Sequence, residues 1–208
     1  MTIDPGAVLW SADKHERTDR PLLVMMHGWS YDETHLFRLA AHLPHELVIA
    51  SVRARTAEAG GYAWFPSAGN PIGNPRPQVA NSATHEVMSW LDTLSTPSSI
   101  GLLGFSQGGA LALQMMRQAP GRFAFAVNLA GFVVDDVQSG DRELTRSRPP
   151  VFWGRGAHDG VIPRSALVRT ADWLAEHATA DIRTYPGLGH DVAGQEVVDL
   201  AAFIAAQI

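Results

Sequence analysis

The sequence predicts an α/β fold in which a mostly parallel sheet is covered by helices on both faces. Short apolar runs alternate with segments whose apolar residues recur at helical spacing. This alternation is typical of parallel strands joined by crossover helices. The length of 208 residues and the hydrophobic content of 46% suit one substantial core, so we expect a single domain over residues 1–208.

The expected strands are short apolar runs, several of which end at Gly or Pro. They span residues 7–10, 21–26, 47–53, 99–105, 124–130, 150–154 and 182–185. The expected helices span residues 33–42, 79–94, 107–118, 164–178 and 194–207. Their apolar positions, such as Leu111 and Leu174, are interpreted as core-facing stripes without a chemical role.

One long stretch, residues 55–77, lacks any periodicity and is rich in Gly, Pro and Asn, with Tyr62, Trp64 and Phe65 embedded in it. Structureless loops of this length inside a compact domain are usually functional. We therefore expect this stretch to form a wall of a substrate pocket. The alternative is an ordered loop whose aromatic side chains only cover the edge of the sheet.

Composition excludes several classes of partner. The formal net charge is −5 and no run of Lys or Arg is present, so we expect no nucleic-acid partner. The chain has no cysteine, which excludes disulfides, thiolate metal sites and cysteine nucleophiles. Neither an H-E-x-x-H motif nor a cluster of His and carboxylate residues indicates a metal. Residues 1–10 lack the features of a secretory signal, and no apolar run reaches the roughly 18 residues of a membrane span, so we expect a cytoplasmic protein.

The strongest local motif is the G-x-S-x-G pentapeptide of Gly104, Phe105, Ser106, Gln107 and Gly108. It follows an apolar run and precedes a segment of helical periodicity, which is the setting of a nucleophilic serine. Side chains on either side of so sharp a turn would collide, so the flanking positions need glycine. We interpret Ser106 as a nucleophile; the alternative is a glycine-rich turn before a helix.

A serine hydroxyl becomes a good nucleophile when a positioned base takes its proton, so an acid and a histidine should follow it. Asp159 follows the expected strand 150–154, and His190 follows the expected strand 182–185. The order Ser, Asp, His is the one used by the α/β-hydrolase fold. The sequence therefore predicts a catalytic triad of Ser106, Asp159 and His190.

Hydrolysis also needs donors for the oxyanion that forms on the attacked carbonyl. The backbone N–H of Gln107 opens a helix, where free amides favour negative charge. The backbone N–H of Trp29, in the sequence His27-Gly28-Trp29 after the strand 21–26, is the second expected donor. Because both roles belong to the main chain, the two side chains could vary without loss of the oxyanion hole.

The remaining histidines, among nine in the chain, receive no catalytic role. His27 is expected to brace its own loop, and His158 precedes Asp159 on the same turn, whereas a base must approach Ser106 from a different loop. The others fall in a charged turn or on expected helices and their ends: His15, His35, His42, His45, His85 and His177.

At these motifs the chain resembles the small, lidless carboxylesterase, phospholipase and acyl-protein thioesterase group of α/β-hydrolases. The similar features extend over nearly the whole length: His27-Gly28-Trp29, Trp64-Phe65, the string from Gly104 to Gly109, Asp159 in Asp-Gly-Val-Ile-Pro, and Gly189-His190. The resemblance implies the same triad and the same oxyanion donors, and it leaves a homodimer open. It also implies hydrolysis of carboxylic esters or thioesters.

Two features depart from that group. Trp29 stands where an aliphatic residue is more common, which argues against long acyl chains, and Pro66 replaces an acidic residue. The stretch between the strand ending near Ala130 and Asp159 is too short for a large helical cap, so we expect an open cleft. Its expected walls are Trp29, Trp64, Phe65, Phe105, Phe132 and Ile162.

The leading hypothesis is a carboxylesterase that forms an acyl-enzyme on Ser106, takes a small-molecule ester and needs no cofactor. One alternative is an acyl-protein thioesterase or lysophospholipase activity at the same site. The other is a catalytically inactive member of the fold that binds a ligand in the aromatic cleft. Fold and triad do not fix the natural substrate.

Overall fold

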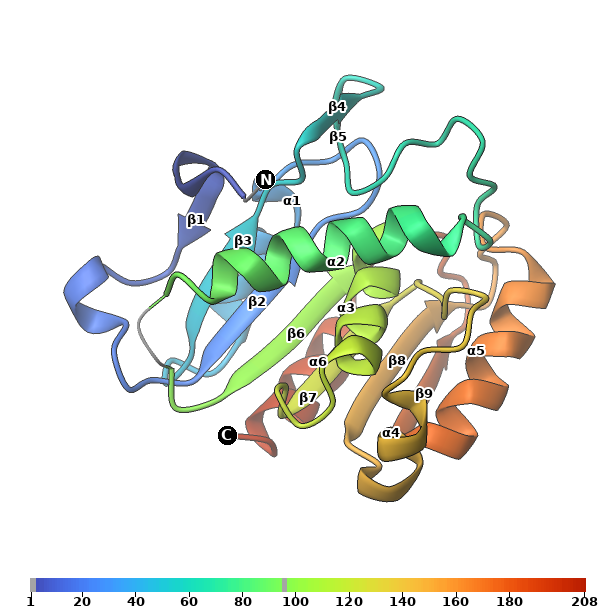
Figure 1. Cartoon of the computed structure of the whole chain (residues 1–208). Helices are drawn as coiled ribbons and strands as arrows, with labels where there is room; N and C mark the ends of the chain where they lie inside the picture. Colours follow the sequence, from blue (N-terminus) through green and yellow to red (C-terminus); the bar gives the residue numbers. More distant parts are fainter. Residues whose placement is uncertain (1–2, 95–96) are drawn as a thin grey trace.

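The computed structural model describes residues 3–94 and 97–208, and its centre is a seven-stranded sheet of order β1-β3-β2-β6-β7-β8-β9 (Figure 1). The strands of this sheet are Val8–Trp10 (β1), Leu22–Met26 (β2), Val48–Val52 (β3), Ile100–Phe105 (β6), Phe125–Leu129 (β7), Pro150–Gly156 (β8) and Thr179–Tyr185 (β9). Only β1 pairs antiparallel with its neighbour β3, and the other pairs are parallel. The predicted, mostly parallel sheet is therefore confirmed.

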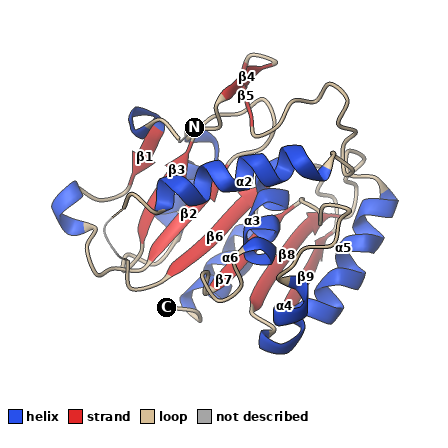
Figure 2. Cartoon of the chain, viewed as in Figure 1, coloured by secondary structure: helices blue, strands red, loops and turns tan. Residues whose placement is uncertain are grey.

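The α-helices are Thr34–Phe37 (α1), Pro77–Leu91 (α2), Gln107–Gln118 (α3), Asp141–Ser147 (α4), Arg164–His177 (α5) and Gln195–Ala205 (α6). Short 3-10 helices span Pro5–Ala7 (η1), Lys14–Glu16 (η2) and Arg38–His42 (η3). In Figure 2, α2 and α3 cross in front of the strands and α6 lies behind them. Helices thus cover both faces of the sheet.

The inner strands of the sheet, β2, β3, β6, β7 and β8, are almost fully buried, because helices cover both faces. Along β2, Leu22 and Val24 belong to a core cluster that includes Leu111 of α3, whereas Leu23 belongs to a second cluster with Leu200 of α6. Successive side chains of a strand point to opposite faces. A continuous apolar run therefore supplies two cores at once, which explains why it could be recognised in the sequence.

A hairpin lies within the stretch that we expected to lack secondary structure. Its strands are Thr56–Glu58 (β4) and Gly61–Ala63 (β5), which pair antiparallel and project at the top of Figure 1. Each strand has three residues, too few to give a periodic pattern. The expectation of a wholly irregular stretch over residues 55–77 was wrong at this hairpin.

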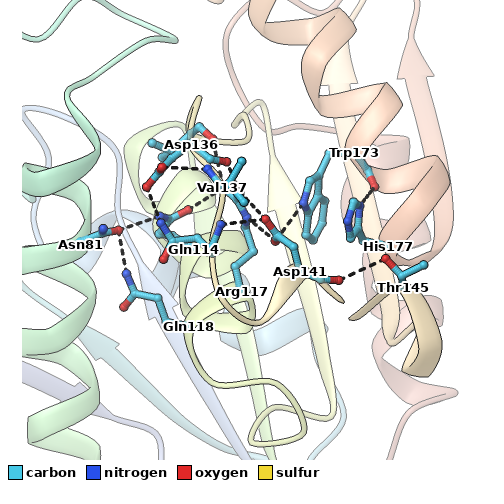
Figure 3. A network of polar contacts seen from close by, with 12 residues as sticks. Asn81, Gln114, Arg117, Gln118, Asp136, Val137, Asp141, Thr145, Trp173 and His177 are labelled. Atoms are coloured by element: carbon cyan, nitrogen blue, oxygen red, sulfur yellow. Dashed lines mark hydrogen bonds and ion pairs between the residues drawn. The ribbon is translucent and has the colours of Figure 1, made fainter. Parts of the chain in front are cut away.

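A buried arginine fixes the segment between β7 and α4. Arg117 of α3 is 1% exposed and donates to both carboxylate oxygens of Asp141 at 2.8 Å. It also donates to the carbonyl of Val134 at 3.0 Å and to that of Asp136. Figure 3 shows this network between α3 and Trp173 of α5. The network stabilises the short connection between β7 and α4.

The loops that follow β2, β6, β8 and β9 meet at the carboxyl edge of the parallel strands, where α/β proteins place their sites. Among the described residues between β7 and β8, the one helix is α4, with seven residues. The expected absence of a large cap in this stretch therefore agrees with the structure. None of the helices in the described ranges has the length and apolar character needed to span a membrane.

Candidate active site

Ser106 occupies the sharp turn between β6 and α3. Its backbone has φ 54° and ψ −113°, in the left-handed half of conformational space that costs a non-glycine residue energy. A Cβ at Gly104 would lie 2.0 Å from the carbonyl of Gly108, and one at Gly108 would lie 1.9 Å from the carbonyl of Met26. The turn therefore needs glycine at both flanking positions, as the motif predicts.

The structure brings Ser106, His190 and Asp159 into one chain of contacts. His190 Nε2 lies 3.0 Å from Ser106 Oγ, and His190 Nδ1 lies 2.8 Å from Asp159 Oδ2. Both distances are within hydrogen-bond range. His190 is on the loop after β9 and Asp159 on the loop after β8, so three strand ends supply the three side chains.

Backbone amides hold the Asp159 carboxylate in place. Its Oδ1 accepts from the N–H of Val161 at 2.8 Å and from the N–H of Ile162 at 3.2 Å, which leaves Oδ2 for His190. The Asp159 side chain is 1% exposed. The two backbone amides thus orient the carboxylate, and its second oxygen fixes the orientation of the His190 imidazole ring.

Trp29 and Gln107 border the cavity that contains Ser106. Their backbone N–H groups donate to no acceptor among the described residues, so both remain available for a ligand. Ser30, directly after Trp29, has φ 65°. Its N–H donates to the carbonyl of Tyr62 at 2.9 Å, so β5 supports the strained loop.

His27 braces this loop from inside. Its Nε2 accepts from the N–H of Ala54 at 3.0 Å, and its Nδ1 lies 2.7 Å from the carbonyl of Gly28. Burial lowers the pKa of His27 to about 4. The ring is therefore neutral at pH 7, and its two contacts fix the tautomer with the proton on Nδ1.

The cavity at Ser106 has a volume of about 480 Å³ and a mostly apolar lining. Its walls include the expected residues Trp29, Phe65, Phe105 and Phe132, together with Ser67, Asn70, Pro71 and Ile72 from the stretch 55–77 that we expected to form a pocket wall. Tyr31 and Val161 also border it and had not been expected. A more open hollow of about 780 Å³ along α5 contains none of the triad residues. Size alone therefore does not choose between the two hollows, and the candidate site is placed at Ser106 because of its contact with His190.

Two expected wall residues do not border the cavity. Ile162 is 3% exposed and packs in the core, and its neighbour Val161 takes the wall position. Trp64 is 8% exposed and borders a different hollow, of about 320 Å³, together with Arg55 and Val79. Adjacent residues in a loop can point in opposite directions, and the sequence around a motif does not tell which one faces the ligand.

A mostly parallel sheet with a serine on a strand-to-helix turn, and with an acid and a histidine on later strand ends, defines the α/β-hydrolase fold. The chain belongs to the phospholipase/carboxylesterase family, whose family model matches residues 11–208.

Within the described ranges, no group of three His, Asp or Glu side chains is arranged to hold a metal ion.

Two curated relatives have related names. The chain is 28% identical over 145 residues to acyl-protein thioesterase 1 of Saccharomyces cerevisiae, an alignment that covers 68% of this chain and 64% of the yeast protein. It is 27% identical over 113 residues to carboxylesterase SOBER1 of Arabidopsis thaliana, covering 53% of this chain and 49% of that protein. The chain thus spans less than two thirds of the length of each.

Two solved structures share the fold over almost the whole chain. The Bacillus cereus carboxylesterase superposes with a TM-score of 0.81 at 19% identity and covers 97% of this chain and 94% of its own. Esterase PE8 superposes with a TM-score of 0.77 at 19% identity and covers 100% of both chains. At these identities the likeness shows the fold alone.

Proposed function

We propose that the protein hydrolyses carboxylic esters through an acyl-enzyme on Ser106. The observation that carries this proposal is the continuous contact from Ser106 Oγ through His190 to the buried Asp159 carboxylate. A hydroxyl, a base and an orienting acid in this arrangement are what activation of a serine requires. The same contacts argue against an inactive, ligand-binding member of the fold.

The reaction has two halves. His190 Nε2 takes the proton of Ser106 Oγ while the oxygen attacks the ester carbonyl, and the imidazolium then gives that proton to the departing alcohol. Water loses a proton to His190 and attacks the acyl-enzyme, which releases the acid and restores Ser106. Asp159 stabilises the imidazolium in both halves, and the atoms and protons balance with this chain, the ester and water.

The backbone amides of Trp29 and Gln107 would stabilise the oxyanion in each half. Both residues border the cavity at Ser106, and neither amide has an acceptor among the described residues. The amide of Gln107 also opens α3, where the partial positive charge of a helix N-terminus favours an anion. Removal of one such donor typically slows hydrolysis about 10²- to 10³-fold.

The position of His190 indicates which side of the cavity would hold the alcohol group of the ester and which would hold the acyl group. The leaving oxygen must receive its proton from His190 Nε2, so the alcohol group lies toward His190 and Val161. The acyl group then extends away from His190, and we assign it to the apolar part of the lining that includes Phe65 and Phe132. An apolar acyl group of limited length suits this aromatic lining.

Thioesters and lysophospholipids are the second candidate substrates, because the yeast relative is named an acyl-protein thioesterase and the family includes phospholipases. The same triad would cleave either bond. The rate of product release from a thioester can be compared with that from an oxygen ester of equal acyl length. This comparison separates the candidates.

A cytoplasmic location and a homodimer remain predictions.

The test of the proposed function is labelling with a fluorophosphonate probe and hydrolysis of 4-nitrophenyl esters from acetate to palmitate. Wild type should react in both assays, and Ser106→Ala in neither. Ser165→Ala changes an exposed serine of α5 and should behave as wild type. Retained hydrolysis in Ser106→Ala would contradict the assignment, and an unlabelled, folded wild type would favour the inactive ligand-binding protein.

A further inference from the structure

Trp64 contacts both segments that carry the proposed oxyanion donors. It is 8% exposed and does not border the cavity. We propose that Trp64 is a positioning residue that sets the placement of the Trp29 and Gln107 amides relative to each other. This inference rests on the proposed ester hydrolysis.

The first contact of Trp64 is with the side chain of Gln107. The backbone N–H of Trp64 donates to Gln107 Oε1 at 3.1 Å, and Gln107 Nε2 donates to the carbonyl of Phe65 at 3.0 Å. Gln107 is 8% exposed, so its side-chain amide has little access to water, and these two hydrogen bonds satisfy its polar atoms instead. The first residue of α3 is thereby tied to the Trp64–Phe65 peptide, and the Gln107 side chain has a role that the sequence did not suggest.

The second contact is with the loop that carries Trp29. The indole Nε1 of Trp64 donates to the carbonyl of His27 at 2.8 Å, and the two rings lie 5.2 Å apart between centroids. A buried indole N–H usually has an acceptor, and here the acceptor is the carbonyl of the residue at the start of the loop. Trp64 therefore joins the end of β2 to the start of α3.

The geometry of the peptide bond carries this restraint to the donor itself. The His27 ring holds the carbonyl oxygen of Gly28 at 2.7 Å from Nδ1. In a planar trans peptide the C=O and the following N–H point in opposite directions. When His27 fixes the Gly28 carbonyl, it also fixes the direction of the Trp29 N–H, and Trp64 fixes His27.

A residue that acts in this way should affect the reaction rate rather than substrate binding. Trp64 does not border the cavity, so its loss removes no contact with the bound ester. Misplaced donors weaken the interaction with the oxyanion, which exists only after attack on the carbonyl. Loss of such an interaction lowers kcat and leaves KM nearly unchanged.

The experiment compares Trp64→Phe with Trp153→Phe. Trp64→Phe keeps an aromatic ring and removes the N–H that binds His27. Trp153 is 2% exposed, and its indole N–H has no partner among the described residues, so Trp153→Phe makes the same change in size without breaking a hydrogen bond. Gln107→Leu and Gln107→Glu test the other contact, because glutamate keeps the acceptor for the Trp64 N–H.

For each folded variant we would measure kcat and KM for a 4-nitrophenyl ester, and the Ki of a trifluoromethyl ketone, which forms an oxyanion on Ser106. Trp64→Phe should lower kcat about tenfold, with KM within about twofold of wild type and Ki raised in parallel with the loss of kcat. Trp153→Phe should change neither kcat nor Ki. Gln107→Leu should resemble Trp64→Phe, and Gln107→Glu should recover part of the rate.

Wild-type kcat and Ki in folded Trp64→Phe would overturn the inference while the proposed function stands. A rise in KM alone would also overturn it, because that result means a role in binding. If Trp64→Phe fails to fold, the kcat and Ki of Gln107→Leu decide in the same way. A wild type with no Ser106-dependent hydrolysis would overturn the proposed function, and with it this inference, before any variant is compared.

Discussion

His190 Nδ1 lies 2.8 Å from Asp159 Oδ2, and the Asp159 side chain that makes this contact is 1% exposed. Its other oxygen is occupied by the amides of Val161 and Ile162. The carboxylate can therefore hold one imidazole tautomer, with the proton on Nδ1 and the lone pair of Nε2 toward Ser106. The geometry of the site thus depends on a charge that has almost no access to water.

The first prediction concerns Asp159→Asn. The amide keeps the shape of the side chain but can present N–H to His190 Nδ1, which favours the wrong tautomer, so kcat should fall by about 10⁴. Steady-state hydrolysis of 4-nitrophenyl acetate measures the change, and Asp172→Asn, on the exposed face of α5, is the control. A loss of less than about tenfold would mean that Asp159 does not orient the base.

The second prediction concerns the support of the Trp29 loop by the hairpin. A Cβ at Gly61 would lie 2.0 Å from the carbonyl oxygen of Ser30, whereas a Cβ at Gly60 meets no atom within 4 Å. Gly61→Ala should therefore displace the loop and lower kcat about 10²-fold, the effect of a misplacement of roughly 1 Å.

Gly60→Ala is the matched control for this variant, because Gly60 is the neighbouring residue in the same hairpin. Gly60 has φ +81°, so alanine strains the backbone there without a clash. Its stability should fall while its kcat stays near that of wild type. Equal losses of kcat in the two variants would indicate that strain in the hairpin, not a clash with Ser30, controls the rate.

The large elements could be predicted because their signals are local. The apolar runs of the buried strands and the periodicity of α3, whose bounds at Gln107 and Gln118 agree with the expected range, each lie within one short window. Three elements, β4, β5 and α4, were not predicted because they lack such a local signal. The strands β4 and β5 are too short for a pattern, and α4 buries only Leu144, so it has no apolar stripe.

In the candidate site, too, the residues that belong to local motifs could be predicted, and the contacts between distant parts of the chain could not. Ser106 and its glycines form a local motif, and the order of Asp159 and His190 follows from the strands that precede them. The link between Trp64 and Gln107 joins residues 43 positions apart, and no local pattern in one sequence reports such a contact. The choice between Val161 and Ile162 as a wall depends on a loop conformation that the Asp159 carboxylate fixes.

The third prediction concerns the acyl side of the cavity. Phe132 is 2% exposed and borders the cavity, so Phe132→Ala should make room for longer acyl groups. The ratio of kcat/KM for the octanoate ester to that for the butyrate ester should rise about tenfold or more, since each buried methylene is worth about 1–3 kcal/mol. Phe123→Ala removes an equally large side chain that does not border the cavity, and it should leave the ratio unchanged.

The fourth prediction concerns the pair of Arg117 and Asp141. Burial acts to raise the pKa of Asp141, but hydrogen bonds from Arg117 and from the Gln138 amide outweigh it and hold this pKa below its usual value. Asp141→Asn leaves the guanidinium, 1% exposed, without a counter-charge. The free energy of unfolding should fall by about 3–5 kcal/mol.

Urea denaturation measures this loss, and Asp92→Asn provides the comparison. The Asp92 carboxylate pairs with Arg122 at 2.6 Å but is 64% exposed, and surface pairs are worth about 0–1 kcal/mol. Similar losses in the two variants would mean that the Arg117 network contributes no more than a surface pair. Folded Asp141→Asn should keep its kcat, because neither partner borders the cavity.

The last prediction concerns Glu196, at the start of α6. Glu196 is 0% exposed, and both of its carboxylate oxygens lack hydrogen-bond partners among the described residues. Burial, reinforced by Asp191 and Asp199, raises its pKa from 4.5 to about 8. A carboxyl group in such a place is more easily kept as the neutral acid than as an anion.

The sign of the pH effect follows from linkage. Between pH 4.5 and about 8 the unfolded chain loses this proton while the folded chain keeps it, so the Glu196 contribution to stability is complete below that window and declines across it as the pH rises. The amide introduced by Glu196→Gln does not titrate. The Tm of Glu196→Gln relative to wild type should therefore be higher at pH 8 than at pH 5, by on the order of 10 °C.

Thermal unfolding of both proteins from pH 5 to 8.5 tests this prediction. Any constant cost of the new amide is the same at every pH, so only the change in the Tm difference with pH is informative. Glu143→Gln, at an exposed position of α4, should show a Tm difference that does not vary with pH. A flat difference for Glu196→Gln as well would mean that Glu196 is ionised in the folded protein, and that a partner absent from the described contacts stabilises its charge.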